Sequence, residues 1–244
     1  MREVPAPAVV VGVDGSKAAL HATVWAVEEA ICRDIPLRLV YVVDPLNPVG
    51  AGGGDGPQAA ACTALHVARQ AAESAGKPVK VESEILYGKP LNKLMEESRY
   101  APMICIGSIG LNHACRGAGS VAAALATSAL CPVAVINRPA GGPATPALDG
   151  IAVGVNNGVV LRHAFEEARL RGVPLHLVSG NGSGSVQLSR RMARWTRLYP
   201  DVQVETCTHI GRDQLFVVDS HECRDVCGTP TVEFSVLAIR SGNL

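Results

Sequence analysis

Short apolar runs alternate with helix-spaced apolar stripes along the first half of the chain. Residues 8–13 (AVVVGV) form an unbroken run rich in Val, as expected of a strand that is buried on both faces of a sheet. Ser16 is placed to cap the helix that follows, and Pro36 marks the end of that helix. The apolar stripe of this helix consists of Leu20, Val24, Val27 and Ile31.

The same alternation continues to residue 136 and predicts five strands separated by helices. The further strands are expected at 37–43, 79–86, 103–106 and 133–136. The further helices are expected at 58–75, 90–99 and 120–130. A chain that alternates in this way folds as a parallel, doubly wound α/β sheet with helices on both faces.

After a stretch rich in Pro and Gly, the chain repeats itself. VGVNNG at 153–158 matches VGVDGS at 11–16, and FEEARLRGVPLHLV at 165–178 matches VEEAICRDIPLRLV at 27–40. Later segments match in the same order: 215–220 with 103–108, and 235–240 with 132–137. Because ordered matches rarely arise by chance, we infer a tandem duplication.

The duplication predicts two domains of unequal length. We place the first domain at residues 1–138, a linker at 139–150 and a shortened second domain at 151–244. On this interpretation the second copy has lost part of its middle loops and the helix before its last strand. Its helix around 188–198 carries Arg190, Arg191, Arg194 and Arg197 opposite Leu188, Met192, Trp195 and Leu198. That basic face is either simply solvated or a docking stripe for an acidic partner.

Composition and charge exclude several classes of protein. The chain has 22 Lys and Arg against 22 Asp and Glu, and this neutrality argues against a nucleic-acid-binding protein. No apolar stretch reaches the ~20 residues of a membrane span, and no signal peptide is evident. Eight cysteines without a CxxC motif are expected to be reduced thiols. We therefore expect a cytoplasmic protein that binds neither nucleic acid nor membrane.

Two glycine-rich segments end strands that are expected to be neighbours. GVDGS at 12–16 closes the first strand, GSIG at 107–110 closes the fourth, and GAGS at 117–120 opens the next helix. Ligands of open parallel sheets bind at such strand ends, where the winding reverses. Glycines let a phosphate approach backbone N–H groups, and a helix N-terminus attracts anions. These segments either form a nucleotide site or merely serve turns and a helix cap.

The combined pattern resembles the universal stress protein family. It consists of G-x-x-G at 107–110, a spacer, G-S-V at 119–121, an Ala- and Leu-rich helix and a Cys-Pro-Val strand. The resemblance covers residues 8–136 well and the rest as a degraded second copy. It is similar to tandem members found in dormancy and in low-oxygen (hypoxia) responses. It implies two sheets of strand order 3-2-1-4-5 and, in one branch of the family, an ATP site.

Carried over by motif, the resemblance implies a binding residue set for ATP, with or without Mg²⁺. Asp14 and Val42 would hold adenine and ribose, and Gly107 and Gly110 would line the ribose and phosphate side. The residues expected to contact the phosphates are Gly119, Ser120 and Val121. The spacer 111–118 is one residue shorter than in the ATP-binding branch. Arg116 either helps to neutralise phosphate charge or points into solvent.

The second copy departs further from the motif. Asn156 replaces Asp14, Asp219 replaces the first motif glycine and Glu222 replaces the second. Because an acidic side chain in a phosphate cradle repels the ligand, we predict one nucleotide per chain and none in the second copy. The spacing of His209, His221, Cys223 and Cys227 fits no standard zinc motif, so we predict no metal site.

The sequence contains no P-loop, no G-x-S-x-G and no H-E-x-x-H motif, so we predict no catalytic residues and no enzyme activity. The leading hypothesis is an ATP-binding stress-response regulator that acts through nucleotide-dependent conformation or through an unknown protein partner. The alternative is a nucleotide-free interaction scaffold with a collapsed site. The family resemblance further implies that strands 132–137 and 235–240 pair within the chain as a pseudo-dimer. A homodimer of whole chains stays open.

Overall fold

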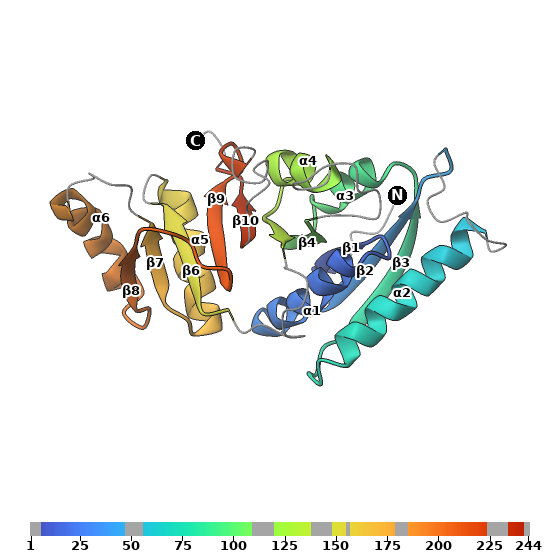
Figure 1. Ribbon diagram of the computed structural model, residues 1–244, viewed down its shortest axis with the longest axis horizontal. Helices are drawn as coiled ribbons and strands as arrows, with labels where there is room; N and C mark the ends of the chain where they lie inside the picture. Colours follow the sequence, from blue (N-terminus) through green and yellow to red (C-terminus); the bar gives the residue numbers. More distant parts are fainter. Residues whose placement is uncertain are drawn as a thin grey trace.

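A computed structural model of the chain describes residues 6–46, 56–108, 120–137, 148–154, 157–178, 185–223 and 234–241 (Figure 1). The strands of the first half are β1 (Val9–Val13), β2 (Leu37–Val43), β3 (Val81–Tyr87), β4 (Met103–Gly107) and β5 (Val133–Ile136). Those of the second half are β6 (Gly150–Gly154), β7 (Leu175–Val178), β8 (Val204–Cys207), β9 (Gln214–Asp219) and β10 (Ser235–Ile239). The helices are α1 (Lys17–Cys32), α2 (Pro57–Glu73), α3 (Pro90–Glu97), α4 (Ser120–Ser128), α5 (Gly158–Arg171) and α6 (Ser185–Leu198).

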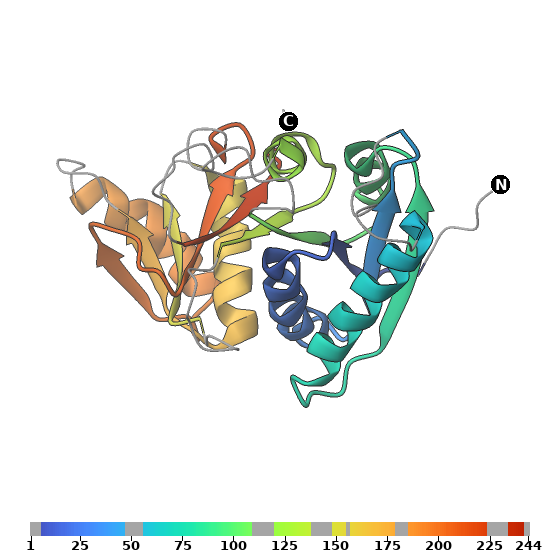
Figure 2. The ribbon, with the colours of Figure 1, turned by 45° about the vertical axis from the view of Figure 1, so that its right-hand side comes forward.

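The described strands form a single sheet in the order β3-β2-β1-β4-β5-β10-β9-β6-β7-β8. Within each half the order is 3-2-1-4-5 and all pairs are parallel, which confirms the predicted doubly wound α/β architecture. The two halves join through one antiparallel pair, β5 with β10 (Figure 2). The predicted pairing of the two last strands within one chain is therefore confirmed.

The β5–β10 register makes this junction pseudo-symmetric. Ile136 pairs with the last residue of β4, and Ile239 pairs with the last residue of β9, so these two isoleucines are equivalent. Counting back two residues from each makes Ala134 equivalent to Leu237, and these two residues face each other across the junction. A pseudo-twofold axis thus passes through this pair, as it does through the centre of an isologous interface.

The helices begin and end where short-range signals place them. The Ser16 hydroxyl accepts the backbone N–H of Ala19 at 3.1 Å and caps α1, as predicted. Prolines open α2 and α3 at their first position, where the missing N–H costs nothing. Asn157 caps α5, and Gly172 ends it in the left-handed conformation with φ 64°.

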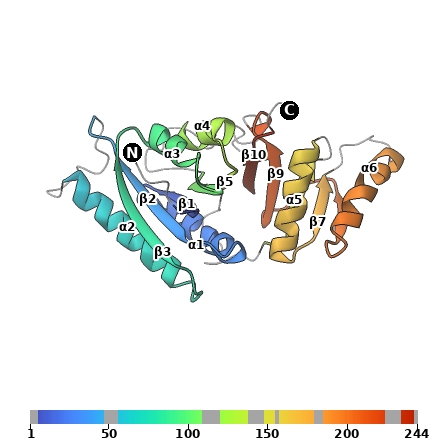
Figure 3. The same cartoon turned by 180° about the vertical axis from the view of Figure 1, so that it is seen from behind.

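Two apolar clusters hold the layers together. The larger one joins α1, α2, α5 and α6 to one face of the whole sheet, with Phe165, Leu37 and Met103 among its fully buried side chains. The smaller one joins α3 and α4 to the opposite face of the first half and extends to β9 and β10 (Figure 3). In the second half, residues 208–213 connect β8 to β9 without a helix, whereas α3 connects β3 to β4 in the first half.

One expectation from the sequence is wrong, and two others stay predictions. Leu198 was expected on the apolar side of α6 but is 57% exposed, because it lies at the last residue of the helix. The predicted loss of a helix before β10 falls at residues 224–233, outside the described residues. The domain limits at 138 and 151 stay predictions, although β6 already begins at Gly150.

Cys105 and Cys131 are buried free thiols, and burial raises the pKa of Cys131 to about 12. A thiol with so high a pKa stays protonated at neutral pH and packs as a small apolar group. Helices long and apolar enough to cross a bilayer are absent from the described part of the chain.

Candidate functional site

The candidate site lies at the carboxyl edge of β1 and β4, where the winding of the first half reverses. Val13 pairs with Tyr41, so Asp14 and Val42 are the next residues along two neighbouring strands. On the other side, Val11 pairs with Cys105, and continuing this register places Gly107 beside Val13. The topology therefore brings Asp14, Val42 and Gly107 to one edge of the sheet.

The Asp14 carboxylate is anchored at this edge. Its Oδ1 accepts the backbone N–H of Ser16 at 2.9 Å, which ties the carboxylate to the turn that starts α1. Burial raises the pKa of the neighbouring Tyr41 phenol, and the negative charge of Asp14 adds a smaller increase. A carboxylate, which when ionised only accepts hydrogen bonds, is thus held at this edge of the sheet by the turn that precedes α1.

An apolar shelf adjoins Asp14 on the face covered by α3 and α4. Val42, Leu91 and Val121 are partly buried side chains that pack against the smaller apolar cluster. The helix α4 begins at Ser120, as predicted. Because the helix of a parallel crossover runs back along the strands, its N-terminus lies at the carboxyl edge and presents backbone N–H groups there.

Gly107 has a packing role that sequence inspection did not reveal. A Cβ atom at this position would lie 2.5 Å from the carbonyl carbon of Ala18 and 2.8 Å from its oxygen. The first turn of α1 therefore requires a glycine here, whether or not a ligand binds. The remaining predicted residues of the glycine motif, Gly110 and Gly119, lie outside the described residues, as does Arg116.

Sequence inspection missed the polar link that ties this edge to the second half. The Ser108 N–H donates to the Ile136 carbonyl at 2.9 Å, and its hydroxyl donates to Asn137 Oδ1 at 3.1 Å. The Asn137 N–H in turn donates to the hydroxyl of Ser235, at the start of β10, at 3.3 Å. The matched Gly-Ser of 107–108 and Asp-Ser of 219–220 were the sequence signal that could have identified it.

The equivalent edge of the second half is filled by a side chain. Ser220 donates to the Ile239 carbonyl at 2.8 Å, as Ser108 does to Ile136, so Asp219 occupies the place of Gly107, as predicted. Asp219 is 6% exposed and accepts hydrogen bonds from Asn157, His221 and Ser241. Asn156, predicted to replace Asp14, lies outside the described residues.

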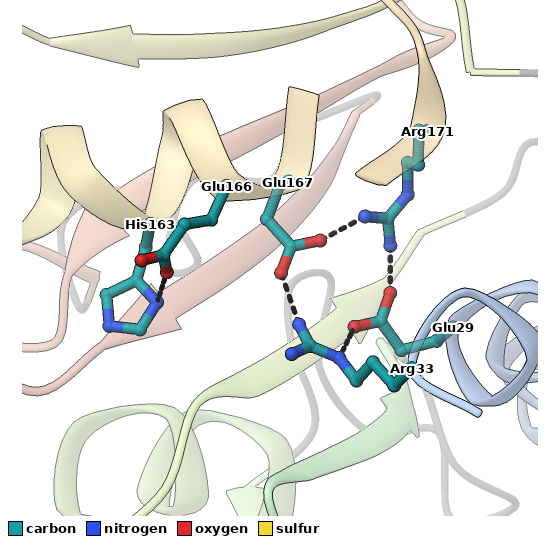
Figure 4. A network of polar contacts seen from close by, with 6 residues as sticks. All are labelled: Glu29, Arg33, His163, Glu166, Glu167 and Arg171. Carbon is teal, nitrogen blue, oxygen red and sulfur yellow. Dashed lines mark hydrogen bonds and ion pairs between the residues drawn. The ribbon is translucent and has the colours of Figure 1, made fainter. Parts of the chain in front are cut away.

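A separate cluster of buried charges joins the halves (Figure 4). Arg33 pairs with Glu29 on its own helix and with Glu167 of α5, and Arg171 pairs with Glu167 and Glu29. We call these four residues the charge ring. Both carboxylates are fully buried, and burial raises the pKa of Glu167 while the two arginines oppose that change. The duplication explains the ring, because Glu29 and Arg33 align with Glu167 and Arg171.

Within the part of the chain that the structure describes, no group of three or more His, Cys, Asp or Glu side chains is arranged to hold a metal ion. Cys227 of the sequence cluster lies outside that part. The charge ring is fully ion-paired, so its geometry supports a structural role between α1 and α5 rather than chemistry.

Comparison with known proteins identifies the family and agrees with the fold. Residues 7–137 match the model of the universal stress protein family. The universal stress protein Rv3134c of Mycobacterium tuberculosis is 53% identical, and the alignment covers 98% of both chains. Rv2028c of the same species is 42% identical over 82% of this chain and 77% of its own. A solved universal stress protein from Archaeoglobus fulgidus shares the fold, with a TM-score of 0.69 at 14% identity over 97% of both chains.

Proposed function

We propose that this chain, which belongs to the universal stress protein family, is a stress-response regulator that binds one adenine nucleotide in its first half. ATP, with or without Mg²⁺, is the proposed ligand. Binding would change the conformation of the crevice or its affinity for a protein partner in the cytoplasm. Low-oxygen and dormancy responses, implied by the resemblance to tandem members, belong to the same proposal.

One observation carries the proposal. Asp14, the apolar shelf at Val42 and Val121, and the start of α4 share one carboxyl edge at the reversal of strand order. Together they supply hydrogen-bond acceptors for a nucleoside, an apolar surface for a base and N–H donors for phosphate. The polar link from Ser108 to Ser235 supports a route by which occupancy would reach the second half.

A second candidate function is a nucleotide-free interaction scaffold, and the packing of Gly107 favours it. Since Ala18 alone accounts for the glycine at 107, the motif does not require a phosphate. The two candidate functions differ in whether the folded protein binds nucleotide.

Freshly purified protein separates them. Acid denaturation followed by mass spectrometry of the supernatant should release close to one mole of adenine nucleotide per mole of chain. Protein that is purified empty should show a rise in melting temperature in millimolar Mg-ATP. Absence of both results would refute nucleotide binding and leave the scaffold.

Variants of Asp14 locate the site. Asp14→Ala removes the proposed nucleoside acceptor and should weaken ATP binding at least tenfold in calorimetric titration. Asp14→Asn is the matched control for folding, because its amide oxygen can still accept the Ser16 N–H that holds the turn. Gly119→Glu should abolish binding while the protein stays folded, since it adds bulk and charge where phosphates would sit. Unchanged affinity in both Asp14→Ala and Gly119→Glu would place the nucleotide elsewhere.

We also propose that the protein is not an enzyme. Phosphoryl transfer needs a positioned base or water-orienting group together with charge neutralisation. Hydrolysis by the purified protein should therefore remain well below about 1 s⁻¹, the low end for kinases. Faster turnover that is lost in Asp14→Ala would contradict this part of the proposal.

A further inference from the structure

We infer that the crevice of the second half is an oxyanion site that the chain occupies with its own side chain, the carboxylate of Asp219. Asp219 ends β9 as Gly107 ends β4, and its side chain lies on the α5 side, equivalent to the side on which α1 covers Gly107. The inference concerns the second half alone and does not depend on whether the first half binds nucleotide.

Donors from three separate segments converge on this carboxylate. The side-chain amide of Asn157, which caps α5, donates to Oδ2 at 2.7 Å. The Ser241 hydroxyl, which follows β10, donates to the same oxygen, and the backbone N–H of His221 donates to Oδ1 at 2.9 Å. The carboxylate therefore ties the start of α5 to the ends of β9 and β10.

The character of these donors indicates an anion site rather than a salt bridge. Asp219 is over nine-tenths buried, and its three hydrogen-bond donors within the described residues are neutral amide, hydroxyl or backbone groups. Its negative charge lies beside the N-terminal cap of a helix, where the helix dipole favours an anion. The hydroxyl of Ser220, the next residue in the chain, is buried and makes no hydrogen bond among the described residues.

The helices α1 and α5 begin at different distances from the equivalent glutamates of the charge ring. In the first half, Ala18 lies eleven positions before Glu29 of the charge ring, and its backbone covers Gly107. In the second half, α5 begins at Gly158, only nine positions before the equivalent Glu167. Asn157, which directly precedes α5, donates its side-chain amide to the Asp219 carboxylate.

The inference predicts chemical rescue in the full-length chain. Asp219→Gly removes the equivalent of an acetate ion, and Asp219→Ala removes the equivalent of a formate ion. Each substitution leaves the donors of Asn157 and Ser241 unsatisfied and should lower the melting temperature by about 3–8 °C. At about 100 mM, acetate should restore at least half of the loss in Asp219→Gly, and formate should do so in Asp219→Ala, while chloride at equal ionic strength restores neither.

Controls separate site binding from general salt effects. Asp201→Gly removes an exposed carboxylate that pairs with Arg169, so its melting temperature should respond to acetate as the wild type does. Asp219→Asn fills the crevice with an isosteric amide and should also show no rescue. Inorganic phosphate is tested as a further anion. Rescue of the melting temperature by phosphate as well as by acetate shows that the crevice admits larger oxyanions.

The outcomes are decisive for the two variants together. Size-matched rescue of Asp219→Gly or Asp219→Ala that is absent from Asp201→Gly supports the inference. Equal responses in all variants, or folded Asp219 variants that no oxyanion stabilises, overturn it. If Asp219→Gly does not fold, Asp219→Ala, which keeps the native Cβ atom, still decides the question. None of these assays contains nucleotide, so their failure is distinct from failure of the proposed function.

Discussion

The two halves present the same strand edge with opposite contents. In the first half, the backbone of Ala18 in α1 covers Gly107, and the Asp14 carboxylate is held nearby by the backbone N–H of Ser16. In the second half, Asp219 fills the corresponding place and is held by Asn157 and Ser241. The strand framework is unchanged between them, since Ser108 and Ser220 make the same backbone hydrogen bond. The same strand ending thus accommodates a helix backbone in one half and a carboxylate in the other.

The interface between the halves shows the reverse pattern, because its residues are duplicated faithfully. Glu29 and Arg33 of α1 meet Glu167 and Arg171 of α5 in a closed ring beside the pseudo-twofold axis. A buried charge without its partner costs several kcal/mol, so a change on one side of the ring is penalised unless the other side compensates. Residues of this interface are therefore constrained in both copies, whereas the residue that ends β4 or β9 can change in one copy alone.

The largest expected effect tests whether Glu29 and Glu167 of the charge ring contribute equally to stability. Glu29→Ala and Glu167→Ala should each lower the free energy of unfolding by about 3–5 kcal/mol, because each leaves Arg33 and Arg171 with one buried carboxylate between them in place of two. Urea denaturation measures both. Glu28→Ala is the matched control, since Glu28 pairs with Lys77 in an exposed position and should cost less than about 1 kcal/mol. Strongly unequal losses for Glu29 and Glu167 would break the symmetry.

The next effect tests the packing at Gly107. Gly107→Ala should destabilise by about 1–3 kcal/mol, because its Cβ atom would overlap the backbone of Ala18 and force α1 to move. Gly154→Ala, at the end of β6, should stay within about 0.5 kcal/mol, since no atom lies within 4 Å of a Cβ there. Denaturant titration of the two variants is sufficient, and similar values for both would disprove the steric explanation.

A smaller effect compares the two helix caps. Ser16→Ala should cost about 1 kcal/mol through loss of the hydrogen bond to Ala19. Asn157→Ala should cost more, because Asn157 caps α5 through Val159 and also donates to Asp219. In the Asp219→Asn background the difference between the two caps should shrink. Equal costs in the wild-type background would argue against a structural role for the Asp219 contact.

The smallest effect concerns pH. Burial lowers the pKa of His163 from its ordinary value of 6.5, with Arg162 and Arg33 reinforcing the change and Glu166 opposing it. The unfolded chain therefore takes up this proton first as the pH falls, and the stability present above pH 6.5 is progressively lost below it. His163→Gln should show a shallower loss of melting temperature between pH 7.5 and 5.5. An unchanged pH profile would assign the dependence to other groups.

Most of the fold follows from local signals in the sequence. Ser16 directly precedes α1, Pro90 opens α3 and Pro36 follows the last residue of α1 by four positions, while the strand order of both halves is what the family resemblance implies. The edge position of Asp14 and Val42 follows from the same topology. These features depend on short-range preferences and on rules for parallel sheets, which a sequence displays directly.

The remaining features depend on which surfaces meet. The Glu-Glu-Ala repeat is visible in the sequence, but the charge ring exists only because the β5–β10 register brings α1 and α5 together. The requirement for glycine at 107 likewise arises from the backbone of Ala18, far away in sequence. The same holds for Leu198, which follows the apolar periodicity of α6 but is 57% exposed at the last residue of the helix.

The covalent link across β5 and β10 has an evolutionary consequence. In a dimer of identical subunits, every substitution appears twice, so a change that closes one crevice closes both. Here the two partners are encoded in a single chain and are always present in equal number, whatever the protein concentration. One partner can therefore acquire an Asp at position 219 while the other keeps its glycine, and the fusion allows a symmetric scaffold to hold two specialised sides.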